Sequence, residues 1–251
     1  MTINLYDVHN CYLIKEATGA GGSFTRSTYE LVQTSPDVHI FISDGAGSRQ
    51  RRREIYPGYK AKRPPLTEDR RSGIDLFKAV LGLSRAVTIN CPGWEADDVI
   101  AQVARDAAND DEVIVHSNDS DFGQLLDTPG VKVPRIKPLE YPAAYVPTFK
   151  ALCGDTTDEV PGLRGFGAGA WDGMRTHWES IKRAFDTQDE ALFLSRPWPK
   201  RCLDKIDFAL LCSFYAVVNF IPVPATDIAA GTALGSNEPA VVHEIFKRFI
   251  L

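Results

Sequence analysis

The sequence predicts an α/β domain with a largely parallel central sheet, followed by a helical C-terminal portion. Short runs of strand-forming residues alternate with helical patterns over about the first 145 residues. One of these patterns, which begins at Ala96, has the spacing of an amphipathic helix. Beyond about Tyr145 strand-like runs stop. Because strands separated by helices are joined by crossover connections, this order favours a mostly parallel sheet.

The elements follow one another in a regular order. The strand-like runs are "INLYDV" from Ile3, "VHIFIS" from Val38, "AVTIN" from Ala86, "EVIVHS" from Glu112 and a weaker "VKVPRI" from Val131. The run "GIDLFKAVLGL", residues 73–83, predicts a helix before the third strand. The helix that starts at Ala96 repeats apolar residues at i, i+3, i+4 and i+7. A further long helix is expected near residues 203–220.

Composition excludes a membrane or secreted class. Hydrophobic residues make up 44% of the 251 residues and charged residues 24%, as in ordinary soluble proteins. The first ten residues lack a basic region followed by an apolar core, so we expect no signal peptide. The longest apolar stretch, "FALLCSFYAVVNFIPVP", is interrupted by Asn219 and two prolines and predicts a buried helix. The five cysteines form no CxxC pair, which indicates reduced thiols in a cytosolic setting.

A basic segment lies within an acidic chain of net charge −5. Between residues 45 and 72, nine basic side chains oppose three acidic ones, and this excess of six positive charges leaves −11 on the rest of the chain. The basic residues are Arg49, Arg51, Arg52, Arg53, Lys60, Lys62, Arg63, Arg70 and Arg71. This distribution indicates local binding of an anion, with a solvated, charge-rich loop as the alternative.

Carboxylates follow three of the predicted strands at their carboxyl ends. Asp7 ends the first run, Asp44 ends the second, and Asp119 and Asp121 follow the fourth. Ligands of open parallel sheets bind outside the carboxyl ends of the strands, so these side chains are expected to meet at one edge. The alternative for each Asp taken singly is a turn or cap residue.

Three further acids, Glu95, Asp97 and Asp98, lie at the start of the helix near Ala96. Their simplest role is to complement the helix dipole. Together with the strand-end acids, however, these converging carboxylates would repel one another unless a cation neutralised them. All of them are oxygen donors, which selects Mg²⁺ or Mn²⁺ over zinc. Two such ions roughly 4 Å apart are the usual device for hydrolysing a phosphodiester.

The stretch "LCGDTTDEVPGLRGFGAGAW" combines two acids, Asp155 and Asp158, with a glycine-rich turn. The glycines of this turn are Gly162, Gly165, Gly167 and Gly169. Glycines permit tight turns, and a turn that opens a helix offers N–H groups to a phosphate. A structural link between two helices is the alternative.

In these motifs the sequence resembles the 5′-nuclease superfamily of flap endonucleases and 5′–3′ exonucleases, especially its bacterial and phage members. The matching pieces, in the order of the family, are "YDVHN", "SDG", "YPGYKAKRPP", "GWEADDVIAQVA", "SNDSDFGQLL" and "GDTTDEVPGLRGFG". They extend from Met1 to about Ala184, which is most of the chain. The combination of EADD, DxD and GDxxDxxPGxxGxG is highly specific.

The resemblance implies a PIN-like core with a helical arch and a C-terminal helix–three-turn–helix element. It implies that Lys60 and Arg63, on one helix face of the arch, reach the scissile phosphate as catalytic residues. It implies metal-binding roles for Asp7, Asp44, Glu95, Asp97, Asp98, Asp119, Asp121, Asp155 and Asp158. The residues expected to contact DNA are Arg49, Arg51, Arg52, Arg53, Tyr59, Lys62, Gly162, Gly165 and Gly167.

The chain also departs from the family pattern. Val8 follows Asp7 where the family often has Gly, and Ser120 stands where Lys is common. After Gly167 the sequence is "AGA" where "PKT" is usual, so that a lysine expected to contact the DNA backbone is missing at Gly169. These departures leave the metal ligands untouched and concern the residues expected to bind duplex DNA.

The resemblance therefore implies a metal-dependent, structure-specific 5′ nuclease of DNA replication or repair in a bacterial or phage-infected cytoplasm. Its expected partner is DNA with a 5′ flap or 5′ end, bound without reading sequence, with RNA primer strands as a further target. Its expected cofactors are two Mg²⁺ ions, for which Mn²⁺ can substitute, and K⁺ at residues 162–169. The alternatives are a PIN-type ribonuclease, or a non-catalytic nucleic-acid-binding module with a vestigial acid site.

Two domains are expected on this basis. Residues 1–145 would form the PIN-like nuclease core, including the basic arch at about residues 46–75. Residues 146–251 would form the helical C-terminal portion with the helix–three-turn–helix element.

Overall fold

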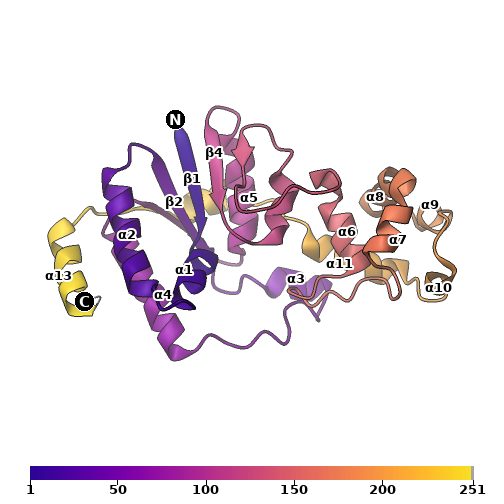
Figure 1. Cartoon of the computed structure of the whole chain (residues 1–251), viewed down its shortest axis with the longest axis horizontal. Coiled ribbons are helices and arrows are strands. Elements are labelled where there is room, and N and C mark those ends of the chain that lie inside the picture. Colours follow the sequence, from indigo (N-terminus) through magenta and orange to yellow (C-terminus); the bar gives the residue numbers. More distant parts are fainter. Residues whose placement is uncertain (250–251) are drawn as a thin grey trace. The chain divides into compact units, whose positions relative to one another are not determined.

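A sheet unit and a helical unit make up the described part of the chain, which is residues 1–249 of a computed structural model. The sheet unit comprises Met1–Ser48, Pro64–Pro138 and the segment that begins at Ile221. The helical unit comprises Arg49–Arg63 and Leu139–Phe220. Figure 1 labels the elements of both. Each unit is assembled from separate stretches of sequence, whereas the sequence analysis divides the chain once, near residue 145.

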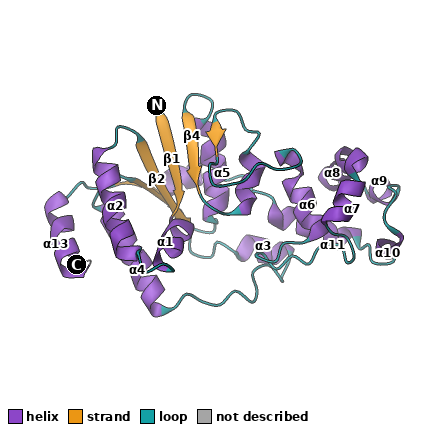
Figure 2. Ribbon diagram, in the orientation of Figure 1, coloured by secondary structure: helices purple, strands orange, loops and turns teal. Residues whose placement is uncertain are grey.

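The sheet unit is built on a six-stranded sheet with strand order β5-β4-β1-β2-β3-β6 among the described residues. The first five strands pair in parallel and lie where the sequence predicts them. They are β1 (Thr2–Asp7), β2 (Val38–Asp44), β3 (Val87–Cys91), β4 (Glu112–His116) and β5 (Val131–Lys132). The predicted α/β fold with a mostly parallel sheet is therefore confirmed (Figure 2).

The sixth strand, β6 (Thr232–Leu234), corrects the prediction that strands stop after about Tyr145. It pairs antiparallel with β3, with Val87 opposite Leu234. All three of its side chains are exposed, so the strand has no hydrophobic alternation for a sequence pattern to detect. Backbone pairing at the sheet edge holds it in place.

Helices cover both faces of this sheet. The helices α1 (Val8–Glu16), α2 (Gly21–Thr34) and α4 (Glu68–Gly82) pack around Phe41 and Phe77. The helix α5 (Ala96–Ala107) packs against β1, β2 and β4, and its bounds match the predicted amphipathic helix. Since side chains alternate between faces along a strand, Leu5 and Ile42 point away from the face that carries Phe41.

The C-terminal segment returns to the sheet unit. The helix α12 (Ala225–Gly231) packs beside β3. The last helix, α13 (Pro239–Phe249), packs through Val242 and Phe246 against Val80 of α4. A short 3-10 helix, η1 (Ser120–Leu125), follows β4 in the same unit.

The helical unit surrounds an aromatic core in which Trp171 and Trp178 stack with ring centroids 4.5 Å apart. Its α-helices are α3 (Gln50–Ile55), α6 (Val146–Cys153), α7 (Ala168–Gly173), α8 (Trp178–Thr187), α9 (Glu190–Leu194), α10 (Lys200–Leu203) and α11 (Phe208–Val218). Two 3-10 turns, η2 (Ala143–Tyr145) and η3 (Arg175–His177), complete it.

The helix predicted near residues 203–220 is shorter than expected. α10 ends at Leu203, and Asp207 caps a new helix by accepting a hydrogen bond from the Leu210 N–H at 3.0 Å. Side-chain caps of this kind satisfy N–H groups that lack a partner within the helix. The helix α11 therefore begins at Phe208.

The basic segment differs from the predicted helical arch. α3 spans six residues, and the chain between it and α4 consists of turns and extended backbone. Three prolines interrupt this stretch, and Lys60 has a left-handed φ of 47°. The prediction that Lys60 and Arg63 share a helix face is therefore wrong.

The described helices include none that is both long and apolar enough to cross a bilayer. All five cysteines are free thiols.

A histidine at the end of β4 couples folding of the sheet unit to pH. The His116 ring stacks on Tyr6 with centroids 4.4 Å apart, and its Nε2 lies 2.9 Å from Asn4 Oδ1. Burial lowers the pKa of His116 to about 4, and the positive charge of Arg135 acts in the same direction. The folded protein therefore favours the neutral ring.

Protonation should consequently favour unfolding as pH falls from the ordinary histidine pKa of about 6.5 towards 4. The stabilising contribution of His116 is fully present above that range and is lost within it. We expect His116→Gln to lower the Tm more at pH 7.5 than at pH 4.5, and thermal melting of both proteins at both pH values measures this. An equal loss of Tm at the two pH values would contradict it.

Candidate active site

The acids at the carboxyl edge of the sheet accept hydrogen bonds from backbone N–H groups near the starts of α1, α5 and the 3-10 helix η1. Asp7 Oδ1 accepts from the Asn10 N–H at 3.0 Å, Asp44 Oδ1 from the Ala96 N–H at 2.9 Å, and Asp119 Oδ1 from the Asp121 N–H at 3.0 Å. Asp7 and Asp119 therefore act as caps of the helices that follow them, whereas Asp44 bonds to the start of α5, which is distant in sequence. Each uses one oxygen in this way, and its second oxygen can still bind another group.

Three carboxylates of the sheet unit converge on one point. One carboxylate oxygen from each of Asp97, Asp119 and Asp121 lies within 4.8 Å of the other two. These residues come from the first turn of α5 and from the loop and 3-10 helix after β4. An all-oxygen donor set at this spacing fits a hard divalent cation such as Mg²⁺ or Mn²⁺.

Asp7 is strongly influenced by this environment. Burial raises the pKa of Asp7 to about 7, and the negative charges of Asp44 and Asp119 act in the same direction, while the hydrogen bond from Asn10 opposes them. Burial is the main cause of the upward shift in pKa, and Asp44 and Asp119 add a smaller repulsion. A cation nearby would favour the ionised form of Asp7.

Glu95 and Asp98 are not among the three acids whose oxygens converge within 4.8 Å of one another in the described part of the chain. Both are buried, with 3% and 1% of their surface exposed. Asp98 Oδ1 accepts a hydrogen bond from the Ile221 N–H at 2.8 Å. This bond joins α5 to the start of the C-terminal segment, a structural role that the sequence did not indicate.

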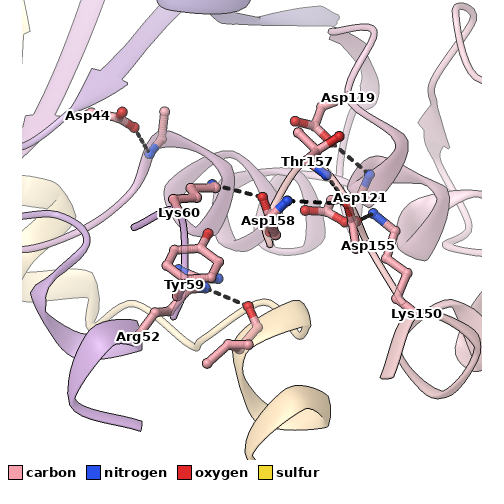
Figure 3. Close-up of polar contacts among 12 residues, drawn as sticks. Asp44, Arg52, Tyr59, Lys60, Asp119, Asp121, Lys150, Asp155, Thr157 and Asp158 are labelled. Carbon is pink, nitrogen blue, oxygen red and sulfur yellow. Dashed lines mark hydrogen bonds and ion pairs between the residues drawn. The ribbon is translucent and has the colours of Figure 1, made fainter. Parts of the chain in front are cut away.

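In the helical unit, the two remaining predicted metal ligands lie in a turn after α6, and each forms an ion pair (Figure 3). Lys150 Nζ is 2.7 Å from Asp155 Oδ2, and Lys60 Nζ is 3.4 Å from Asp158 Oδ1. Burial alone would raise the pKa of Asp155, but Lys150 and the N–H groups of Thr157 and Asp158 outweigh it and lower that pKa. Sequence reasoning missed Lys150, which carries no motif of its own.

Two residues expected to contact DNA are buried instead. Arg52 is 4% exposed, and it donates from Nε to the Val217 carbonyl at 2.8 Å and from Nη2 to the Asn219 carbonyl at 3.0 Å. Tyr59 is 2% exposed, and its ring packs against Arg52 and Lys60. Arg52 thus binds the end of α11, and neither side chain lies on an exposed surface.

The other predicted DNA contacts remain at the surface. Arg51, Arg53, Lys62 and Arg63 are exposed and Arg49 is partly exposed. Arg53 also donates to the carbonyls of Tyr59 and Lys60, at 3.2 and 2.9 Å. The exposed charge of the basic segment is therefore smaller than its sequence suggests.

The glycine-rich turn contains two positions that require glycine. Gly162 has φ of 69°, and a Cβ there would lie 2.4 Å from the Gly154 nitrogen. Gly165 has φ of 87°, a left-handed value that disfavours side chains. Gly167 and Gly169 have open space around them. Arg201 of α10, which sequence reasoning missed, donates from Nε to the Gly165 carbonyl at 2.7 Å.

Comparison with known proteins gives a family match. The family model described as the 5′–3′ exonuclease N-terminal resolvase-like domain matches residues 14–148. A 5′–3′ exonuclease of Aquifex aeolicus is 28% identical over 190 residues, which cover 67% of this chain and 66% of that protein. DNA polymerase I of Mycobacterium tuberculosis is 31% identical over 188 residues, which cover 68% of this chain but 21% of the polymerase. The chain thus corresponds to about a fifth of the polymerase relatives.

Solved structures share the fold. A bacteriophage T5 flap endonuclease in complex with DNA and metal ions aligns with a TM-score of 0.60 at 19% identity, covering 100% of this chain and 97% of that one. The catalytic core of Rad2 in complex with DNA substrate aligns with a TM-score of 0.58 at 14% identity, covering 98% and 85%.

The buried position of Arg52 leads to a stability prediction. Arg52→Ala should lower the free energy of unfolding by about 2–4 kcal/mol, because the buried Val217 carbonyl and the partly buried Asn219 carbonyl lose their donor. Arg51→Ala removes the same charge from an exposed neighbour and should cost less than about 1 kcal/mol. Urea unfolding of both variants distinguishes the two roles, and an equally small effect would place Arg52 outside the core.

Proposed function

The chain belongs to the 5′–3′ exonuclease family, through the N-terminal resolvase-like domain matched over residues 14–148, and from this premise we propose that it is a metal-dependent 5′ nuclease. Its proposed substrate is DNA with a 5′ end or 5′ flap. The observation that carries the proposal is the convergence of Asp97, Asp119 and Asp121 at the edge where β1 and β2 also end in acids. A site that only bound DNA would gain nothing from carboxylates that repel phosphate.

We propose that Asp97, Asp119 and Asp121, with Asp7 and Asp44 beside them, hold Mg²⁺, and that Mn²⁺ can replace it. When bound, such a cation supplies an activated water and stabilises the charge that develops on the phosphate. The backbone hydrogen bonds to Asp7, Asp44 and Asp119 fix these carboxylates before any ligand arrives. Metal binding by Glu95, Asp98, Asp155 and Asp158, a second metal ion, and K⁺ at residues 162–169 remain predictions.

The basic residues would act on the DNA strand. Lys60 is 4% exposed, its ammonium pairs with Asp158, and it lies 4.7 Å from the centre of the Tyr59 ring, so its position is set before substrate binds and contact with a phosphate requires the substrate to reach a buried group. We assign to Lys60 and Arg63 the stabilisation of charge on the scissile phosphate during hydrolysis. The exposed Arg51, Arg53 and Lys62 would guide the 5′ strand without reading sequence.

Duplex binding would use the glycine-rich turn together with Arg201. The Arg201 Nε donates to the Gly165 carbonyl while the side chain remains exposed. The guanidinium Nη atoms would thus be available to a phosphate. Arg164 is exposed in the same turn. These two arginines supply positive charge that the turn lacks at Gly169.

Cleavage of a 5′-flap DNA substrate tests the proposed activity. Mg²⁺ should support cleavage, and excess EDTA should abolish it. Asp119→Asn and Asp121→Asn should each reduce the rate by at least about 100-fold, since charge stabilisation is lost, while DNA affinity in EDTA stays equal or improves because one repelling charge is gone.

The matched control is Asp110→Asn, which removes an exposed acid that lies outside the carboxylate group and should cleave at the wild-type rate. Near-normal cleavage by both site variants, or full activity in EDTA, would refute the metal mechanism. A parallel RNA substrate tests the ribonuclease alternative.

The proposed duplex contact leads to a second test. Arg201→Ala should weaken binding to blunt duplex DNA and reduce the slope of log K against log salt by about 1, as expected for one lost phosphate contact. Lys200→Ala removes an exposed charge from the same helix without touching the turn and should change the slope less. Identical slopes for Arg201→Ala and the wild type would place Arg201 outside the DNA path.

A further inference from the structure

We propose that Glu159 is a positioning residue that fastens the basic segment to the turn carrying Asp155 and Asp158, and thereby fixes Lys60. The proposal rests on the proposed function only for its effect on catalysis. Its structural part concerns contacts within the helical unit. In this contact, residues 56–63 of the basic segment lie against the turn formed by residues 154–160.

Backbone strain marks this contact. Among the described residues, four that are not glycine have positive φ, namely Lys60, Glu159, Gln188 and Asn237. Lys60 and Glu159, with φ of 47° and 59°, lie on opposite sides of the same contact. A left-handed backbone is unfavourable for a residue with a long side chain, and it persists only where surrounding interactions impose it.

Hydrogen bonds explain why the strain persists. The turn is closed by two backbone hydrogen bonds between Asp155 and Val160, at 2.7 and 2.8 Å. The Lys60 N–H donates to the Asp158 carbonyl at 3.1 Å. Two residues further on, the Lys62 N–H donates to Glu159 Oε1 at 2.7 Å. The segment is thus attached to a rigid turn on both sides of Ala61.

The residue type at position 159 supports a role for its carboxylate. If only the left-handed backbone mattered, glycine would suit this position better. A negative charge beside a segment meant to bind phosphate is also unfavourable for binding. The feature that glutamate adds is an oxygen far enough from the backbone to accept the Lys62 N–H. We infer that this bond is the reason for glutamate here.

The consequence for Lys60 is geometric. Its ammonium lies 3.4 Å from Asp158 Oδ1, and its backbone is held by its N–H on the Asp158 carbonyl and by Arg53 on its own carbonyl. Loss of the Glu159 bond would release one of the two attachments and let Lys60 sample other positions. When a residue that stabilises the transition state is poorly positioned, the rate of the catalysed step falls, while the affinity for substrate changes less.

Three substitutions separate the possible contributions of Glu159. Glu159→Gln keeps the acceptor oxygen and removes the charge. Glu159→Ala removes the acceptor and keeps the backbone strain, whereas Glu159→Gly removes the acceptor and relieves the strain. The Gly variant is therefore expected to fold even if the Ala variant is destabilised, and thermal melting checks this.

Amide hydrogen exchange at Lys62, measured in metal-free buffer by NMR, tests the attachment without any need for activity. Exchange should accelerate by about tenfold or more in the Ala and Gly variants and stay near the wild-type rate in the Gln variant. The Val160 amide, which donates to Asp155, serves as the internal reference and should keep its protection. Trypsin should likewise cut after Lys60 and Lys62 faster in the Ala and Gly variants than in the wild type. Cutting after Arg135, in an exposed loop of the sheet unit, is the reference and should not change.

Flap cleavage tests the catalytic part. The Ala and Gly variants should lose about tenfold in kcat with little change in KM, and the Gln variant should keep the wild-type kcat. Wild-type exchange at Lys62 in the Gly variant would overturn the proposal, as would a Gln variant that behaves like Ala. If the wild-type protein cleaves no substrate, the proposed function fails, and the exchange and trypsin measurements still decide whether Glu159 holds the segment.

Discussion

The crowding of carboxylates at one edge of a parallel sheet is the constraint on which the site depends. Asp7 is 7% exposed and lies near two other acids, so its ionised form is disfavoured in the absence of a cation. The fold tolerates this because Asp7, Asp44 and Asp119 also accept hydrogen bonds from backbone N–H groups. The same carboxylates thus bond to the first turns of α1, α5 and η1 and have a second oxygen that can face the edge.

The helical unit handles buried acids in another way. Asp155 and Asp158 are matched by Lys150 and Lys60 within the unit, and the pair of strained residues Lys60 and Glu159 is held by hydrogen bonds. Buried ion pairs of this kind are costly to break, because removal of one partner leaves the other charge without compensation. The position of Lys60 is therefore set by contacts within the unit itself.

Particular residues show how far sequence reasoning reached. The positions of Asp7 and Asp44 at the ends of β1 and β2, and the helix from Ala96, were predicted correctly, because strand alternation and helix spacing are local patterns. Arg52 and Tyr59 were misplaced, because charge and aromatic character do not indicate whether a side chain is buried. The strand β6 escaped detection because three exposed residues carry no pattern.

Local sequence was therefore sufficient for the α/β class, the positions of the first five strands, the family and the set of candidate acids, since each depends on residue type at a short, regular spacing. Tertiary structure alone selected Asp97, Asp119 and Asp121 as the converging group, paired Lys150 with Asp155, and placed Arg201 on the glycine-rich turn. These outcomes depend on contacts between residues that are distant in sequence. Such contacts follow from packing, which no short-range periodicity records.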